Sequence, residues 1–194
     1  MRTRIALTAL LAAIVVFAGS PAMPARAAET KYDFEKCEQG WKAKAGWERS
    51  DLTEGSTNSG QVMAYNLYDD GLERGEAVTS AVHQWPGGKK KVTFKARWQF
   101  EYYPPEPSGQ LTTLDRGAFE TSTDGGKTWK SRSGFGLTNS SFPEFNAVVA
   151  EFDAPAGAIQ FRFVIYSDGN TPGFGLQVDD IAIPTASPDG IGCK

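Results

Sequence analysis

Residues 91–103 read KVTFKARWQFEYY. Apolar residues occupy every second position from Val92 to Tyr102, and the positions between them are polar or charged as far as Glu101. A period of two is typical of a β-strand that has one buried face and one face in water. Two prolines follow at once and end the predicted strand, because proline cannot donate to a hydrogen-bond ladder.

The same alternation recurs along most of the chain. Residues 159–166, IQFRFVIY, form a second clear strand pattern. Weaker patterns predict strands at residues 32–35, 61–67, 77–84, 117–122, 128–132, 145–152 and 176–183, with glycine-rich turn signals between them. We find no sustained helical period after residue 27. Roughly nine strands with short turns favour an all-β sandwich or barrel.

Residues 1–27 have the three parts of a secretory signal peptide. Arg2 and Arg4 precede the apolar run IALTALLAAIVVFA, and an Ala-Arg-Ala sequence ends at Ala27. The run is too short for a comfortable membrane span, which needs about 20 residues. We therefore expect cleavage after Ala27. Residues 28–194 then form one secreted domain, extracellular or periplasmic, with no membrane insertion.

The net charge indicates which partners are disfavoured, and the cysteine content indicates whether a disulfide forms. The chain carries 20 Lys and Arg against 23 Asp and Glu, a net charge of −3. An acidic balance argues against nucleic acid as a partner. The two cysteines are Cys37 and Cys193. An even count in an exported chain favours a disulfide, which would join the ends of the domain. Two free thiols are the alternative.

An ordered set of short motifs runs along residues 28–194: Asp33-Phe34-Glu35, Gly40-Trp41, Trp47, Thr79-Ser80, Ser122–Trp129, Gln160–Phe163, Ser167-Asp168 and Val178–Ile181. This set resembles a known family, the MAM-like jelly-roll modules of secreted bacterial peptidases of the immune inhibitor A type. The resemblance covers most of residues 28–194. It implies a two-sheet antiparallel jelly-roll β-sandwich with an accessory or adhesive role, often with a structural calcium ion. Because residues 28–194 are expected to form a single domain, we do not expect a fused peptidase, and this departs from the arrangement in that family.

Four carboxylates occur at the two ends of the domain. Asp33 and Glu35 lie on the first predicted strand, and Asp179 and Asp180 lie on the last. Neighbouring carboxylates repel one another unless a cation neutralises them, and calcium prefers oxygen ligands. Similar jelly-rolls use a first-strand Glu and a last-strand Asp. We predict a structural calcium ion held first by Glu35 and Asp180 and then by Asp179 and Asp33. Solvated carboxylates are the alternative.

The stretch Ser122–Trp129 matches the S-x-D-x-G-x-x-W pattern known as the Asp-box. Asp124 is placed to accept backbone N–H groups across a turn, and Gly125-Gly126 supply the backbone angles that such a turn needs. Repeats of this box occur in propellers, but a single copy cannot build one. We predict a structural role for the motif.

Catalytic residue sets are sparse. His83 is the single histidine, which excludes a multi-histidine zinc site, and we predict a structural role for it. Glu151-Phe152-Asp153 matches the start of an E-x-D-x-x-E glycosidase signature, whose second Glu is missing. We therefore predict that the protein is not an enzyme. A small secreted glycan hydrolase that uses paired carboxylates is the alternative.

Aromatic side chains suggest a binding role, because Trp and Tyr rings can stack on sugars. The predicted ligand-binding residues are Trp41, Trp47, Tyr68, Trp85, Tyr103 and Phe142. The sequence therefore predicts a secreted binding or adhesion module that recognises a glycan or an extracellular protein surface. A self-associating surface or matrix protein is a further alternative.

Overall fold

The structure is a computed structural model that describes residues 28–44, 46–51, 61–65, 76–100, 115–135, 143–167, 174–189 and 191–193. The described residues form twelve strands. None of them forms a helix long and apolar enough to cross a membrane. The predicted signal peptide and three predicted ligand-binding residues, Tyr68, Tyr103 and Phe142, lie outside the described residues.

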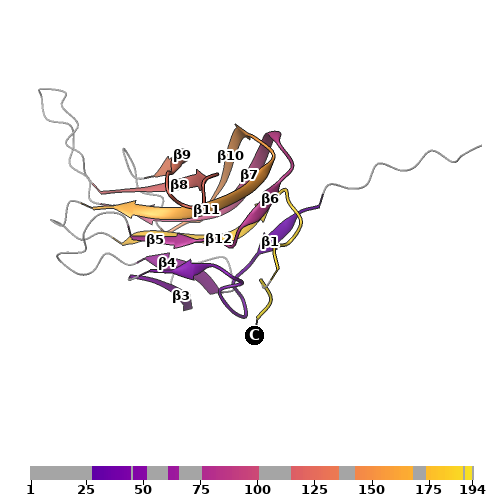
Figure 1. Ribbon diagram of the computed structural model, residues 1–194. Helices are drawn as coiled ribbons and strands as arrows, with labels where there is room; N and C mark the ends of the chain where they lie inside the picture. Colours follow the sequence, from indigo (N-terminus) through magenta and orange to yellow (C-terminus); the bar gives the residue numbers. More distant parts are fainter. Residues whose placement is uncertain are drawn as a thin grey trace, which may run out of the picture.

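The strands form two antiparallel sheets that face one another (Figure 1). Sheet A has the order β10 (Asn146–Ala154), β7 (Gly88–Gln99), β12 (Gly175–Ile183), β4 (Gln61–Tyr65), β3 (Trp47–Asp51), and β1 (Thr30–Tyr32) also pairs with β12. Sheet B has the order β2 (Lys42–Ala43), β5 (Glu76–Thr79), β11 (Gly157–Tyr166), β8 (Arg116–Ser122), β9 (Lys130–Phe135), and β6 (His83–Trp85) also pairs with β11. The chain is an all-β jelly-roll sandwich, as the sequence predicted.

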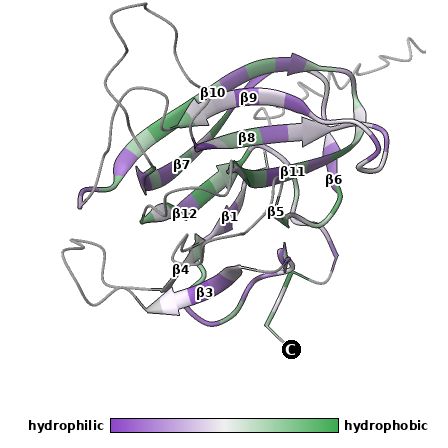
Figure 2. Cartoon of the chain, turned by 90° about the vertical axis from the view of Figure 1, so that its left-hand side faces the viewer, coloured by the Kyte–Doolittle hydropathy of each residue, from purple (hydrophilic) through white to green (hydrophobic). Residues whose placement is uncertain are grey.

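The core fills the space between the sheets. The inward residues of the two clearest predicted strands are almost fully buried: Val92, Phe94, Ala96, Ile159, Phe161, Phe163 and Ile165. Phe94 of sheet A meets Phe163 of sheet B edge to face, with 5.0 Å between the ring centroids. Figure 2 shows the alternation as bands of opposite hydropathy along β10 and β11. The period of two therefore identified the core face correctly.

The predicted strand at 77–84 is in fact two strands, β5 and β6, which both pair with β11. Ser80 separates them. Its Oγ accepts the Phe161 N–H at 3.0 Å and donates to the Ala81 carbonyl at 2.7 Å. The side chain thus replaces a ladder bond where the backbone leaves the sheet. Strands β2 and β3 were not predicted, because neither carries a sustained alternation.

Arg97 departs from the predicted pattern. Its position on β7 assigns it to the wet face, yet only 1% of it is exposed. Its guanidinium lies between two rings, 5.0 Å from the Phe145 centroid and 5.3 Å from the Phe174 centroid. Its Nη1 donates to the Pro143 carbonyl at 3.1 Å. The alternation predicts which face a residue takes, but not what covers that face.

The ends of the domain meet as expected. Cys37 and Cys193 form a disulfide with 5.6 Å between their Cα atoms, and β1 lies beside β12. The two cysteines are 156 residues apart in sequence. A loop of that size gives a stabilisation of about 5 kcal/mol at most in the chain-entropy model. The predicted disulfide is confirmed.

Candidate functional site

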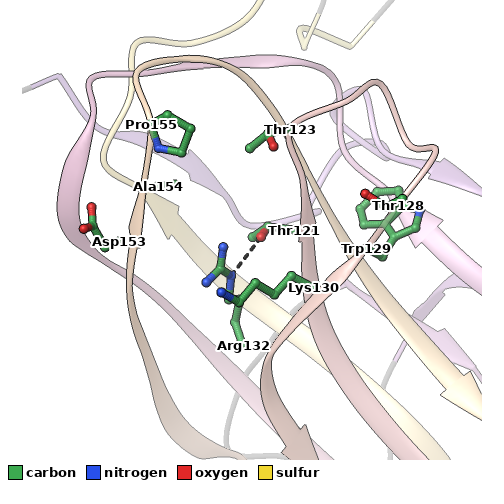
Figure 3. Close-up of a pocket in the computed structure, with 9 residues that line it drawn as sticks. All are labelled: Thr121, Thr123, Thr128, Trp129, Lys130, Arg132, Asp153, Ala154 and Pro155. Atoms are coloured by element: carbon green, nitrogen blue, oxygen red, sulfur yellow. Dashed lines mark hydrogen bonds between the residues drawn. The ribbon is translucent and has the colours of Figure 1, made fainter.

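A hollow of about 310 Å³ opens where β9, at the edge of sheet B, faces the end of β10 in sheet A (Figure 3). One wall is the turn between β8 and β9 together with the first residues of β9. The other wall is Asp153, Ala154 and Pro155, at the turn from β10 to β11. The two sheets therefore contribute one wall each.

The turn that forms the first wall is held rigidly by Asp124. Its Oδ1 accepts the Lys127 N–H at 3.1 Å and the Thr128 N–H at 3.0 Å, and its Oδ2 accepts the Thr128 hydroxyl at 2.5 Å. These bonds, led by the Thr128 hydroxyl, hold the pKa of Asp124 well below its usual range. Gly125 and Gly126 have φ of 74° and 85°, which suits glycine. The hydrogen bonds of Asp124 all stay within its own turn, which is consistent with the predicted structural role.

Trp129 presents a half-buried indole to the hollow. Its Nε1 donates to the Gly126 carbonyl at 3.0 Å. The Arg162 guanidinium carbon lies 4.3 Å from the ring centroid, and Arg162 is itself fixed by Glu120 at 2.6 Å. The indole is therefore held in one orientation before any ligand arrives.

A β-bulge aims Arg132 into the hollow. Phe119 pairs with Ser133 and Glu120 pairs with Ser131, so Arg132 is an extra residue in the register. Bulges re-aim side chains in this way. Its Nε donates to the buried Thr121 Oγ1 at 2.8 Å (Figure 3). Burial lowers the pKa of Arg132, but a guanidinium still carries its charge at neutral pH.

Trp85 supports this wall from inside the core. It is 2% exposed and stacks on Phe152, with 5.0 Å between the ring centroids. The Arg132 guanidinium lies 4.4 Å from the centroid of the same Phe152 ring. The prediction that Trp85 contacts ligand is therefore wrong, because Phe152 lies against it. The residue instead packs beneath the residues that line the hollow.

Two more predicted ligand-binding residues are core residues. Trp41 is 3% exposed and Trp47 is 5% exposed. Trp41 packs edge to face on Tyr32 and also contacts Phe163, with 5.6 Å between centroids in each case. Stacking of either indole on a sugar is excluded in this structure. Both residues lie in weakly patterned stretches, where the sequence does not reveal which face is buried.

His83 is a structural residue, as predicted. It is fully buried, with Nε2 2.9 Å from the Tyr32 hydroxyl and Nδ1 2.7 Å from the Thr185 hydroxyl. Burial lowers its pKa to about 4. Both ring nitrogens therefore have hydrogen-bond partners inside the core.

Two of the predicted calcium ligands, Asp179 and Asp180, lie on β12, whereas Asp33 and Glu35 follow the end of β1 rather than lying on it. The β1–β12 register ends at Tyr32 and Ile181, one residue from Asp33 and Asp180. However, Asp180 pairs with Lys95 at 2.7 Å, and the Asp179 Oδ1 accepts the Asp180 N–H at 2.7 Å. Asp33 Oδ1 accepts the Glu35 N–H at 3.3 Å. Within the described residues, no three His, Cys, Asp or Glu side chains are grouped to hold a metal. The four carboxylates are therefore not grouped as a metal site in the described residues, and calcium binding stays a prediction.

The residues of the hollow also test the alternative prediction of a glycan hydrolase that uses paired carboxylates. A two-carboxylate glycosidase needs a pair of carboxyl groups on opposite sides of the scissile bond. Among the described residues that line the hollow, Asp153 alone carries a carboxylate. The geometry required for that mechanism does not occur in this part of the chain.

The sequence analysis missed the side chains that line the hollow. Trp129 was assigned to the turn only, and neither Thr121 nor Arg132 was singled out. Asp153 was considered only as part of an incomplete glycosidase signature. The available signal was TWKSR at residues 128–132, where basic residues alternate beside a tryptophan on a predicted strand. The β-bulge at Arg132 has no corresponding pattern in the sequence.

Comparisons with known proteins give fold likenesses only. No family model and no curated protein matches the chain. Similar solved structures include the CBM22-1 xylan-binding domain from Paenibacillus barcinonensis Xyn10C (11% identity, TM-score 0.48, 82% of this chain and 94% of that one). Another is CBM6cm-2 from Cellvibrio mixtus lichenase 5A in complex with cellotriose (11% identity, TM-score 0.46, 79% and 94%). A third is the C-terminal CBM6 of LamC from Zobellia galactanivorans (14% identity, TM-score 0.45, 79% and 97%).

Proposed function

We propose that this protein is a non-catalytic glycan-binding module and that the hollow beside the β8–β9 turn is its sugar site. The observation that carries this proposal is the set of side chains that line the hollow together with Trp129. Its half-buried indole shares one hollow with threonine hydroxyls, two cations and a carboxylate. A sugar ring has apolar C–H faces and a rim of hydroxyls, so its recognition needs both kinds of group.

Each group has a distinct part in binding. The sugar ring packs on the Trp129 indole, which excludes water from one face. Asp153 accepts hydroxyl hydrogens, while Lys130 and Arg132 donate to sugar oxygens. The hollow, about 310 Å³, lies at the small end of the range of ligand sites, about 300–1,000 Å³. It suits one or two sugar rings better than a long chain.

The fixed positions of these groups favour affinity. The indole is held by Gly126 and Arg162, and the guanidinium is held by Thr121. Groups that are already ordered lose little conformational entropy when a ligand binds. Weakly binding sugars benefit from this arrangement, because their hydroxyls must first give up hydrogen bonds to water.

We also propose that the protein acts outside the cytoplasm. The signal-like residues 1–27 support this location. The Cys37–Cys193 disulfide supports it independently, because such bonds persist in oxidising compartments. Export of the chain fused to a reporter, with and without residues 1–27, tests the location directly.

The binding proposal is tested with a polysaccharide and oligosaccharide array, followed by calorimetry on any ligand found. We expect Trp129→Ala to weaken binding about tenfold or more, as aromatic hot spots do. Thermal unfolding of the variant should remain close to that of the wild type. Val149→Ala is the matched control, because Val149 is 57% exposed and lies on sheet A outside the hollow. Wild-type affinity in Trp129→Ala, or an array without binding, overturns the proposal.

A further inference from the structure

The two walls of the hollow differ in how their charges are balanced. On β10, Glu151 forms ion pairs with Lys89 and with Lys91, the latter at 3.3 Å. Glu151, and to a lesser extent Asp153, raises the pKa of Lys89. The acids of β10 are therefore matched by lysines of β7, the strand beside it.

The two cations of the β9 wall, Lys130 and Arg132, form no ion pair with any carboxylate of the described residues. Lys130 is exposed, and within the described part of the chain its side chain forms no ion pair or hydrogen bond. Arg132 bonds a neutral hydroxyl on Thr121 and covers the Phe152 ring, and no described carboxylate pairs with it. Two uncompensated cations therefore share one wall in a chain whose net charge is −3.

The geometry of Arg132 suits an anionic oxygen group. Its Nε is already used by Thr121, so the terminal N–H groups are left for a ligand. In Figure 3 the guanidinium reaches into the middle of the hollow, between Asp153 on one wall and Trp129 on the other. A planar guanidinium fork matches the oxygens of a carboxylate or a sulfate. Partial burial strengthens such a pair relative to one in open water.

We infer that the ligand of this hollow is an acidic glycan, whose carboxylate or sulfate ester binds Lys130 and Arg132 while Asp153 accepts hydrogens from its hydroxyls. This inference rests on the proposed glycan-binding function. A uronic acid and a sulfated sugar present the same chemistry, which is anionic oxygens on a hydroxylated ring. The matched reagents in the test separate the two sources.

The test measures binding of matched acidic and neutral oligosaccharides to the intact oxidised protein by calorimetry. One pair is a galacturonate oligomer and its methyl ester, and the other is a sulfated galactose oligomer and its desulfated form. We expect the acidic member of at least one pair to bind about tenfold more tightly. Raising the salt concentration should reduce that preference, because ions screen exposed charges.

Variants locate the effect at the two cations. Lys130→Gln should reduce the preference for the acidic member about tenfold, since it removes one charge. Arg132→Lys keeps the charge but loses the fork, and it should also reduce the preference. Lys127→Gln is the matched control, because Lys127 is an exposed lysine of the same turn that does not line the hollow. It should leave the preference unchanged.

The outcomes separate this inference from the function on which it rests. Equal binding of acidic and neutral members, still sensitive to Trp129→Ala, overturns the acidic ligand and leaves a neutral-glycan module. An unchanged preference in both Lys130→Gln and Arg132→Lys also overturns the inference. If no glycan of either kind binds, the proposed function fails as well.

Discussion

Trp85 and Trp129 are both anchored by a hydrogen bond from the indole N–H to a glycine carbonyl, but they differ in how far the ring is buried. Each indole Nε1 donates to the carbonyl of a glycine three residues away, Gly88 for Trp85 and Gly126 for Trp129. Trp85 then lies against Phe152 with 2% of it exposed, whereas Trp129 stays half-buried at the hollow. The glycine follows Trp85 in the chain but precedes Trp129. A similar anchor therefore holds a core residue in one place and a candidate binding platform in the other.

The largest expected effect comes from Trp85. Trp85→Ala leaves a cavity beneath Phe152 and should cost about 3–5 kcal/mol of unfolding free energy. Trp129→Ala removes a partly exposed ring and should cost roughly 1 kcal/mol or less. Urea unfolding of both variants measures the difference. Equal losses would mean that both indoles are core residues and would remove the contrast between them.

The next effect is a pH dependence set in the core. Burial lowers the pKa of His83 to about 4 from 6.5, so the unfolded chain binds a proton below pH 6.5 while the folded chain does not. Stability is therefore complete above pH 6.5 and falls as the pH drops towards 4, by about 3 kcal/mol in all. Unfolding in urea between pH 7 and 4.5 measures this.

His83→Gln is the control for that titration. Glutamine keeps donor and acceptor groups near Tyr32 and Thr185 but does not titrate. We expect the variant to be less stable at pH 7 and to show a flat profile between pH 6.5 and 4.5. An equally steep fall in the variant would assign the effect to other groups.

A smaller effect tests how Arg132 is positioned. Thr121→Val keeps the buried shape but removes the oxygen that holds the Arg132 Nε. We expect glycan affinity to fall about threefold to tenfold, because the guanidinium is no longer oriented. Thr93→Val, at an exposed outward position of β7, is the matched control. Wild-type affinity in Thr121→Val would show that Arg132 needs no anchor.

The smallest expected effect is that of calcium. Asp180 already pairs with Lys95, and the four predicted ligands do not converge. Millimolar calcium should therefore raise the unfolding midpoint by no more than about 2–4 °C relative to EDTA. A rise of many degrees that Glu35→Gln or Asp180→Asn abolishes would support the sequence prediction of a calcium site.

Much of the fold could be predicted because it depends on short-range pattern. The alternation in β7 and β11 identified the buried rings, such as Phe94 and Phe163. The pairing of Cys37 with Cys193 followed from their positions near the chain ends. The tryptophans were harder, because an aromatic ring suits a core and a binding site equally well. Trp41 and Trp85 were therefore assigned to the wrong environment.

The sequence by itself determined the strand period, the core faces, the tied ends and the rigid turn at Asp124. Each of these depends on neighbours within a few residues, or on a covalent bond between two unique residues. Only the tertiary structure decided where a ligand could bind. The hollow forms because β9 and β10, from different sheets, meet at their edges, and because a bulge turns Arg132 towards that gap. Register and sheet packing are long-range properties, and no local pattern records them.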